Sequence, residues 1–319
     1  RKSSKKWRSA TFSKVSYILR SDFLMFRVRR LLAPFVLCIA LLFSEAQAFT
    51  IAWLSDTQNY HNAYKPIFDG MTQWIADNRE ALDIRFVFHT GDVVGSWSSE
   101  DQWRQARESM DILSSASIPF LAACGNHDIG YRMNYANFLK YVLSLRPASM
   151  SQEYGDTGSR YELFSANGRD YIFMGIAFSN KGPSEDEVNW INGVLRQYSS
   201  RDAIIITHSY LKKSASYTTQ GKAIFEKIVK ANPNVFLVLC GHCRDISYKN
   251  VQLDDDGDGN PDRTVYAILS NFQGSKAGGG GYMRILDFRD SDIYIYTYSP
   301  YYDSCEYPKG KTEATVPLP

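Results

Sequence analysis

The chain is poor in cysteine and histidine, with five of each in 319 residues. Only four cysteines follow residue 48, which is too few for a small fold held together by disulfides. No Asn-x-Ser/Thr acceptor for N-glycosylation occurs. The longest apolar run, residues 31–43, is shorter than the about 20 residues that a membrane-spanning helix needs. With 44% hydrophobic and 22% charged residues, the composition favours an ordinary soluble globular protein.

The net charge of +2 is unevenly distributed along the chain. Residues 1–48 hold ten of the 36 Lys/Arg and two of the 34 Asp/Glu. That leaves 26 basic and 32 acidic residues, a net charge of −6, for residues 49–319. A mildly acidic body gives no signal of nucleic-acid binding.

Residues 25–48 have the pattern of a signal peptide. Met25 is followed by a basic stretch, the apolar run and the small-residue cleavage site Ala46-Gln47-Ala48. We expect cleavage after Ala48, a secreted, periplasmic or lumenal location and no stable membrane anchor. The alternative is an uncleaved anchor behind a basic tail. If the signal peptide begins at Met25, residues 1–24 are an upstream extension or a misplaced start.

Short apolar runs alternate with helical stretches from residue 50 onward, which favours βαβ units and an α/β fold. Strands are predicted at residues 50–55, 84–89, 118–124, 203–207 and 235–240, and helices at residues 64–79, 100–115, 134–145, 184–198 and 222–230. Asn167-Gly168 predicts a hairpin turn. Three later strands, at residues 264–270, 282–288 and 293–298, have no helix between them. One domain over residues 49–300 and a loose tail over residues 301–319 are expected.

Polar segments follow five of the apolar runs, where strands would end. These are Asp56-Thr57-Gln58, Gly91-Asp92, Gly125-Asn126-His127-Asp128, Thr207-His208 and Gly241-His242. Ligand sites of open α/β sheets gather beyond the carboxyl ends of the strands. Oxygen ligands suit hard cations and imidazoles suit transition metals, so the set indicates a two-metal hydrolytic centre.

In their order, these segments resemble the motifs of the calcineurin-like metallophosphoesterase family. The family pattern is D-x-H, G-D, G-N-H-D, a lone His and G-H-x-H, and the resemblance covers nearly all of residues 50–298. It implies an α/β sandwich of two mixed β-sheets flanked by helices. The stretches S-D-T-Q, H-T-G-D and D-R-T-V-Y are similar to those of an exported branch with Gln in the first motif.

The resemblance implies two divalent metal ions (Mn, Fe or Zn). Their ligands would be Asp56, Gln58, Asp92, Asn126, His208 and His242. Asp92 would bridge the two ions, Asp56 and Gln58 would serve the first, and the other three residues would serve the second. A metal-activated hydroxide would then hydrolyse a phosphate mono- or diester.

The resemblance also implies roles for residues that bind no metal. His127 would lie beside the substrate phosphate and assist the leaving group, and Asp128 would orient its ring. Arg244 stands where the family has its final His. A guanidinium has no lone pair for a metal, so Arg244 is predicted to clamp a phosphate oxygen. His61 is a further candidate for the substrate mouth, or a solvated loop residue.

Gln58 and Arg244 together remove two imidazoles from the first metal site, which we expect to be weak. A phospholigand-binding relic without catalysis is therefore an alternative function. A second alternative reads Cys240-Gly241-His242-Cys243 as the active site of a thiol–disulfide oxidoreductase, although no helical pattern follows it. Residues 254–260 start like a calcium loop, but Val265 stands where a bidentate Glu is needed, so a solvated acidic turn is favoured.

Overall fold

The structure is a computed structural model that describes residues 48–145, 152–307 and 313–319. The predicted upstream segment and nearly all of the predicted signal peptide lie outside the described residues. Within the described ranges, no helix combines the length and the apolar character needed to cross a membrane.

The first sheet has six strands and is mixed. Its order is β13 (Ala314–Pro317), β12 (Asp292–Tyr298), β11 (Met283–Phe288), β1 (Phe49–Leu54), β2 (Ile84–His89) and β3 (Phe120–Ala122). The strands β1, β2 and β3 run parallel, and β11 pairs with β1 in the antiparallel sense. The expectation of a loose tail is wrong for its last residues, because β13 pairs with β12 and buries Val316.

The second sheet has seven strands and is also mixed. Its order is β4 (Gln152–Tyr154), β5 (Ser159–Ala166), β6 (Arg169–Ile176), β7 (Asp202–Thr207), β8 (Val235–Cys240), β10 (Arg263–Asn271) and β9 (Asp245–Leu253). The strands β6, β7, β8 and β10 run parallel. The predicted fold of two mixed sheets is confirmed. Strand β9 was not predicted, because it is a partly exposed edge strand rich in polar residues.

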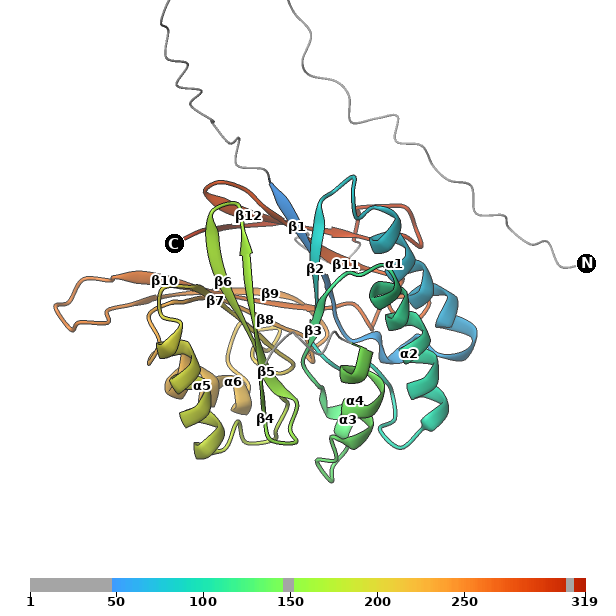
Figure 1. The fold of residues 1–319 in the computed structure, drawn as a ribbon, viewed down its shortest axis with the longest axis horizontal. Helices are drawn as coiled ribbons and strands as arrows, with labels where there is room; N and C mark the ends of the chain where they lie inside the picture. The colour runs from blue at the N-terminus through green and yellow to red at the C-terminus, as the bar shows by residue number, and fades with distance from the viewer. Residues whose placement is uncertain (1–47, 146–151, 308–312) are drawn as a thin grey trace, which may run out of the picture. The chain divides into compact units, whose positions relative to one another are not determined.

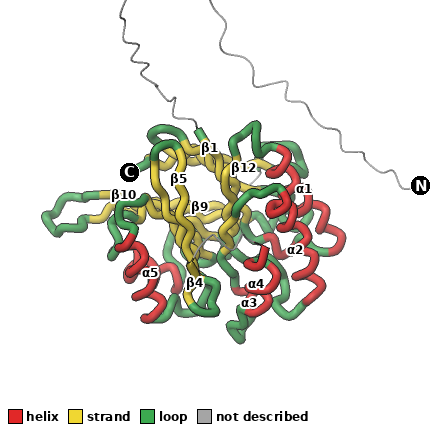
Figure 2. The backbone as a smooth tube through the Cα atoms, in the orientation of Figure 1, coloured by secondary structure: helices red, strands yellow, loops and turns green. Residues whose placement is uncertain are grey.

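Helices cover the outer faces of both sheets. On the first sheet lie α1 (Lys65–Asp77) and α2 (Glu100–Ser115), with α3 (Asn126–Ile129) and α4 (Ala136–Tyr141) beside them; on the second lie α5 (Glu185–Gln197), α6 (Thr219–Ile224) and the π-helical turn η4 (Phe225–Val229). Figure 1 shows these two groups of helices on opposite sides of the strands. In Figure 2 the strands lie together between them.

The inner faces of the two sheets form one apolar core. Ile51 and Trp53 of β1 pack in a cluster with Phe173 of β6 and Leu239 of β8, all of them fully buried. The neighbouring residues of β1 point to the other face, where Leu54 joins the cluster under α1 and α2. Since both faces of β1 are buried, its sequence is a continuous apolar run rather than an alternating one.

Helix and turn signals agree with the structure in part. Ser184 caps α5 by accepting from the backbone N–H of Glu187, as predicted. Asn167 and Gly168 form the hairpin turn with φ of 53° and 73°. The helix predicted at residues 134–145 is shorter, because α4 gives way to a 3-10 turn at Leu143–Leu145. The helix predicted at residues 222–230 starts earlier, since Thr218 supplies an N-cap before α6.

Candidate metal centre

All five polar segments lie at the carboxyl ends of parallel strands. The segments that start at Asp56, Gly91 and Gly125 follow the adjacent strands β1, β2 and β3 of the first sheet. His208 and Gly241 follow the adjacent strands β7 and β8 of the second sheet. The site therefore forms where corresponding strand ends of the two sheets meet.

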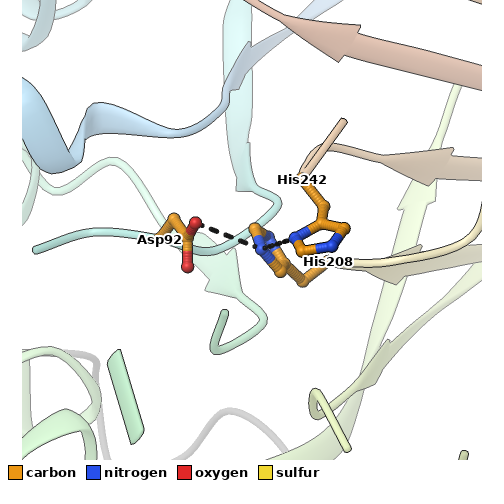
Figure 3. A group of neighbouring side chains, drawn as sticks. All are labelled: Asp92, His208 and His242. Carbon is orange, nitrogen blue, oxygen red and sulfur yellow. Dashed lines mark hydrogen bonds and ion pairs between the residues drawn. The ribbon is translucent and has the colours of Figure 1, made fainter. Parts of the chain in front are cut away.

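His208 lies at the middle of the centre and is fully buried. Its Nε2 lies 3.3 Å from Oδ2 of Asp92, 3.1 Å from Nδ1 of His242 and 3.1 Å from Oδ1 of Asn126. Figure 3 shows the His208 ring between the carboxylate of Asp92 and the ring of His242. The ligand atoms of Asp92, His208 and His242 all lie within 4.8 Å of one another, a spacing that one metal ion can bridge.

The other ring nitrogen of His208 bonds to the backbone. Nδ1 lies 2.8 Å from the carbonyl oxygen of Thr90. Because a carbonyl only accepts, this nitrogen carries the proton and Nε2 can turn a lone pair to a metal. Burial opposes protonation of His208, but the carboxylate of Asp92 outweighs it and raises the pKa of the imidazole, so a metal that binds Nε2 must displace a proton there. Burial lowers the pKa of His242 to about 4, so that ring is neutral and able to bind a metal at pH 7.

Two further predicted ligands, Asp56 and Gln58, have environments that favour a bound cation. Burial and, to a smaller extent, the charge of Asp92 raise the pKa of Asp56 to about 7. Gln58 is buried, and its Oε1 atom has no hydrogen-bond donor among the described residues. An unpaired buried acceptor costs about 1–3 kcal/mol. A divalent cation would satisfy Gln58 and offset the repulsion between the two carboxylates, so the donor set fits such an ion.

The glycines of these motifs allow the loops to approach closely. A Cβ atom at Gly125 would lie 2.2 Å from Oδ1 of Asp92, and one at Gly241 would lie 2.3 Å from Oδ2 of Asp56. Both distances are far inside van der Waals contact. Any larger residue would push a carboxylate away from the centre.

Several supporting residues were not found from the sequence. Ser55 donates a 2.5 Å hydrogen bond to Oδ2 of Asp56, and Asn271 donates one of 3.0 Å to the carbonyl oxygen of His242. His89, the last residue of β2, is a third supporting residue. Its Nε2 lies 3.0 Å from Oγ1 of Thr57, and its Nδ1 accepts from the backbone N–H of Gly91. It therefore ties the first motif to the second. Of Ser55 and Asn271, only Ser55 had a sequence signal, its place beside the first motif.

The ring of His127 has a different partner from the one expected. Its Nδ1 lies 2.9 Å from the carbonyl oxygen of Gly95, and its backbone N–H donates to Oδ1 of Asp92. The Asp128 carboxylate is fully buried and accepts from the backbone N–H groups of Val94 and Gly125. The prediction that Asp128 orients His127 is wrong, because both oxygens of Asp128 accept hydrogen bonds from the backbone of the loops that contain Val94 and Gly125. A backbone carbonyl orients the ring instead.

The two predicted substrate contacts, His61 and Arg244, have different neighbours. His61 is partly exposed, and a methyl group at Gly95 would lie 3.9 Å from its Nε2. His61 is therefore near Gly95, whose carbonyl oxygen bonds to the His127 ring. Arg244 is exposed two residues after His242 and lines a pocket of about 250 Å³.

The cysteine motif lacks the setting of a redox site. Cys240 is fully buried at the end of β8, and burial raises its pKa to about 12. The strand β9 follows Cys243, where a helix would be needed to stabilise a thiolate. The four cysteines of the described residues are all free thiols. The structure therefore argues against the oxidoreductase alternative.

The acidic turn between β9 and β10 is exposed. Oxygens of Asp254, Asp256 and Asp262 lie within 4.8 Å of one another. Asp254, however, accepts from the backbone N–H groups of Gly257 and Gly259 within its own turn. Val265, at the place of the missing Glu, is buried in β10. These features agree with a solvated acidic turn.

Comparison with known proteins identifies the family. The model of the calcineurin-like phosphoesterase family matches residues 49–243, more than half of the chain. The chain therefore belongs to the calcineurin-like phosphoesterase family, a class of hydrolases that act on phosphoric ester bonds. The predicted family and enzyme class are confirmed. The exported branch stays a prediction.

One similar protein is the uncharacterized protein YvnB of Bacillus subtilis (strain 168), 41% identical over 259 residues, or 79% of this chain. The chain spans only 20% of the length of YvnB.

Solved structures share the fold at low identity. A dimetal phosphatase from Danio rerio has a TM-score of 0.57 at 13% identity, over 84% of this chain and 98% of its own. GAP50, the anchor in the inner membrane complex of Plasmodium, has a TM-score of 0.55 at 14% identity, over 85% of this chain and 89% of its own. The purple acid phosphatase PPD1 of yellow lupin (Lupinus luteus) has a TM-score of 0.54 at 13% identity, over 85% of this chain and 54% of its own.

Proposed function

We propose that this chain hydrolyses a phosphate mono- or diester with the help of divalent cations. The observation that carries the proposal is the convergence of Asp92, His208 and His242, whose ligand atoms lie within 4.8 Å of one another although the residues come from three loops. A structural role alone would leave no reason to bring a carboxylate and two imidazoles together at fully or half-buried positions.

The chain would hold two cations, Mn, Fe or Zn, in adjoining sites that share Asp92. Asp56 and Gln58 would serve one site, and Asn126, His208 and His242 the other. When bound, the cations supply Lewis acidity and make hydroxide available at neutral pH. Two hydrogen bonds would orient the ligands. The carbonyl oxygen of Thr90 accepts from the His208 ring, and the hydroxyl of Ser55 donates to the Asp56 carboxylate.

His127 is the proposed general acid. Its Nδ1 is bonded to the carbonyl oxygen of Gly95, so Nδ1 keeps its proton, and the doubly protonated ring would give the leaving oxygen the proton on Nε2. The side chain is exposed, which suits a group that must reach the leaving oxygen. Its backbone N–H donates a hydrogen bond to Asp92, which fixes the backbone of His127 next to the proposed shared metal ligand. His61, near Gly95, would lie at the same side of the substrate.

A non-catalytic phospholigand-binding protein is the second candidate. Gln58 and Arg244 replace the imidazoles that the family pattern has at those places, which weakens one metal site. GAP50, which shares the fold, is described as an anchor in the inner membrane complex of Plasmodium, so a likeness in fold does not by itself require turnover.

A substrate panel tests the choice between the two functions. The purified chain is incubated with Mn²⁺, Fe²⁺ or Zn²⁺ and with an aryl phosphate monoester and an aryl phosphate diester. Metal-dependent release of the aryl alcohol that is lost in Asp92→Asn supports hydrolysis. Binding of inorganic phosphate without turnover under any metal would favour the second candidate.

Export is part of the proposal and rests on residues 25–48 alone. The signal-peptide pattern supports a secreted, periplasmic or lumenal enzyme. Mass spectrometry of the secreted chain tests it, because cleavage after Ala48 makes Phe49 the first residue.

A further inference from the structure

A pocket of about 250 Å³ adjoins the segment that carries His242. It is lined by Lys213, Arg244, Asp245, Asn271, Gly274 and Tyr307. Asn271 links it to the metal centre, because its side-chain amide donates a 3.0 Å hydrogen bond to the carbonyl oxygen of His242. Arg244 and Asp245 of the lining follow His242 by two and three residues, so the pocket adjoins the segment that leaves the metal centre.

The pocket has a positive charge that the rest of the body does not share. Nζ of Lys213 lies 2.5 Å from Oδ2 of Asp245, so these two charges offset each other and the lysine is held at the rim. The guanidinium of Arg244 has no hydrogen bond or ion pair to any residue in the described ranges. Its charge is thus available to a ligand, in a chain whose residues 49–319 have a net charge of −6.

Tyr307 adds a neutral donor to the pocket. Tyr307 is buried, and its hydroxyl oxygen accepts from Oγ of Ser275 at 3.4 Å, which leaves the phenolic proton to donate. Burial raises the pKa of Tyr307, so that proton is kept at neutral pH. Arg244 offers a planar fork of N–H groups that matches the oxygens of a phosphate.

The volume sets a limit on the ligand. Pockets for drug-sized molecules have about 300–1,000 Å³. A pocket of about 250 Å³ suits a small charged group on a larger substrate.

We propose that this pocket binds a second phosphate group of the substrate, so that the substrate class is a bisphosphate. The proposal rests on the proposed function, because the first phosphate is the one hydrolysed at the cations. Water then adds its oxygen to that phosphorus, the bond from phosphorus to the alcohol oxygen breaks, and the alcohol leaves with a proton and with the second phosphate still attached. Arg244 and Tyr307 hold that second phosphate.

The test compares substrates that differ only in the second phosphate. The full chain with Mn²⁺ is given α,ω-alkanediol bisphosphates, from ethane-1,2-diol to hexane-1,6-diol, and the alkyl monophosphates of the same lengths. Phosphate release gives kcat/KM for each. We expect a preference of at least about 10-fold for a bisphosphate at one spacer length, the size of effect of one hydrogen bond to a charged group. Equal values for both series at every length overturn the proposal.

Two variants assign the preference to the pocket. Arg244→Gln is expected to reduce the preference at least about 10-fold. Lys276→Gln is the matched control, since it removes one positive charge from the loop that contains Gly274 without lining the pocket. An Arg244→Gln enzyme with the wild-type preference overturns the proposal, and so does an equal loss in both variants. A stronger preference for 3-phosphooxypropanoate, which has a carboxylate in place of the second phosphate, overturns the phosphate assignment.

A binding measurement separates this proposal from the proposed function. Propane-1,3-diol bisphosphate is titrated calorimetrically into the metal-free full chain, the Arg244→Gln variant and the Lys276→Gln variant. If the wild type hydrolyses nothing, the proposed function fails. An affinity that falls about 10-fold in Arg244→Gln alone still supports the pocket. Affinities that do not depend on Arg244 overturn it, whatever the activity.

Discussion

Nε2 of His208 lies 3.3 Å from Oδ2 of Asp92, and the two residues come from different sheets. Asp92 follows β2 and His208 follows β7, so the pair joins the two halves of the sandwich at the strand ends. Neither side chain is exposed, and the Nδ1 atom of His208 is fixed by the carbonyl of Thr90. Burial and this hydrogen bond therefore fix the orientation of the His208 ring toward Asp92.

Asp92→Asn should remove most of the activity and leave the fold intact. The amide keeps the volume and can still accept from the backbone N–H of His127, but it loses the negative charge that two cations would share. Loss of an outer partner of a metal ligand costs about 10- to 100-fold, so loss of the shared ligand should exceed about 100-fold in kcat/KM. Steady-state kinetics and circular dichroism measure the two parts. Full activity in the folded variant would contradict the assignment of Asp92.

His127→Ala should lower kcat without reducing metal content. The loss of a general acid costs about 100- to 10,000-fold. Among the described residues, the exposed ring bonds only to the carbonyl of Gly95, so its removal should leave the buried candidate ligands in place. Kinetics and elemental analysis on the same preparation check both statements. A variant that loses its metals together with its activity would show that His127 belongs to the ligand set.

Asp128→Ala should destabilise the fold. The buried carboxylate accepts from the N–H groups of Val94 and Gly125, and each donor left without a partner costs about 1–3 kcal/mol. Asp128→Asn keeps one acceptor oxygen and should lose less. Chemical denaturation of the three proteins gives the free energies of unfolding. Equal stabilities would mean that Asp128 has a role other than fixing these loops.

The metal content after dialysis should be below two ions per chain. Gln58 supplies a neutral oxygen where the family pattern has an imidazole, and Arg244 cannot bind a metal. Gln58→His should increase the content by restoring one imidazole. Elemental analysis of both proteins against a metal-free buffer tests this. Two tightly held ions in the wild type would refute the account of the weak site.

Ser184→Ala should cost about 1 kcal/mol of stability. The Ser184 hydroxyl accepts from the backbone N–H of Glu187 at the start of α5. Ser184→Asp keeps an acceptor at the cap and should retain most of that stability. Thermal unfolding of the two variants measures the difference. Equal losses in both would show that the cap contributes little.

The strands and ligand motifs could be predicted because their signals are local. Ile84–His89 and Val235–Cys240 are continuous apolar runs of strand length, and their predicted bounds match the structure. The hairpin at Asn167-Gly168 also has a local cause, since both residues tolerate positive φ. Where burial is partial the pattern weakens, which is why β9 and β13 were missed.

The partners of the site residues could not be predicted, because they depend on distant backbone. The Gly95 carbonyl that orients His127 carries no side-chain signal, and Asp128 stands next to His127 in sequence while its oxygens face another loop. The pocket of Arg244 is likewise formed by loops far apart in the chain, with Tyr307 from beyond the last long strand.

The sequence by itself determined which candidate ligands exist and in what order, because short motifs after apolar runs are encoded residue by residue. Only the tertiary structure decided which atoms meet. Packing of the two sheets places the ends of β2, β7 and β8 at one edge, and from that placement come the contacts of Asp92, His208 and His242. Hydrogen bonds and charges act over a few ångströms, so their partners are defined only once the chain has folded.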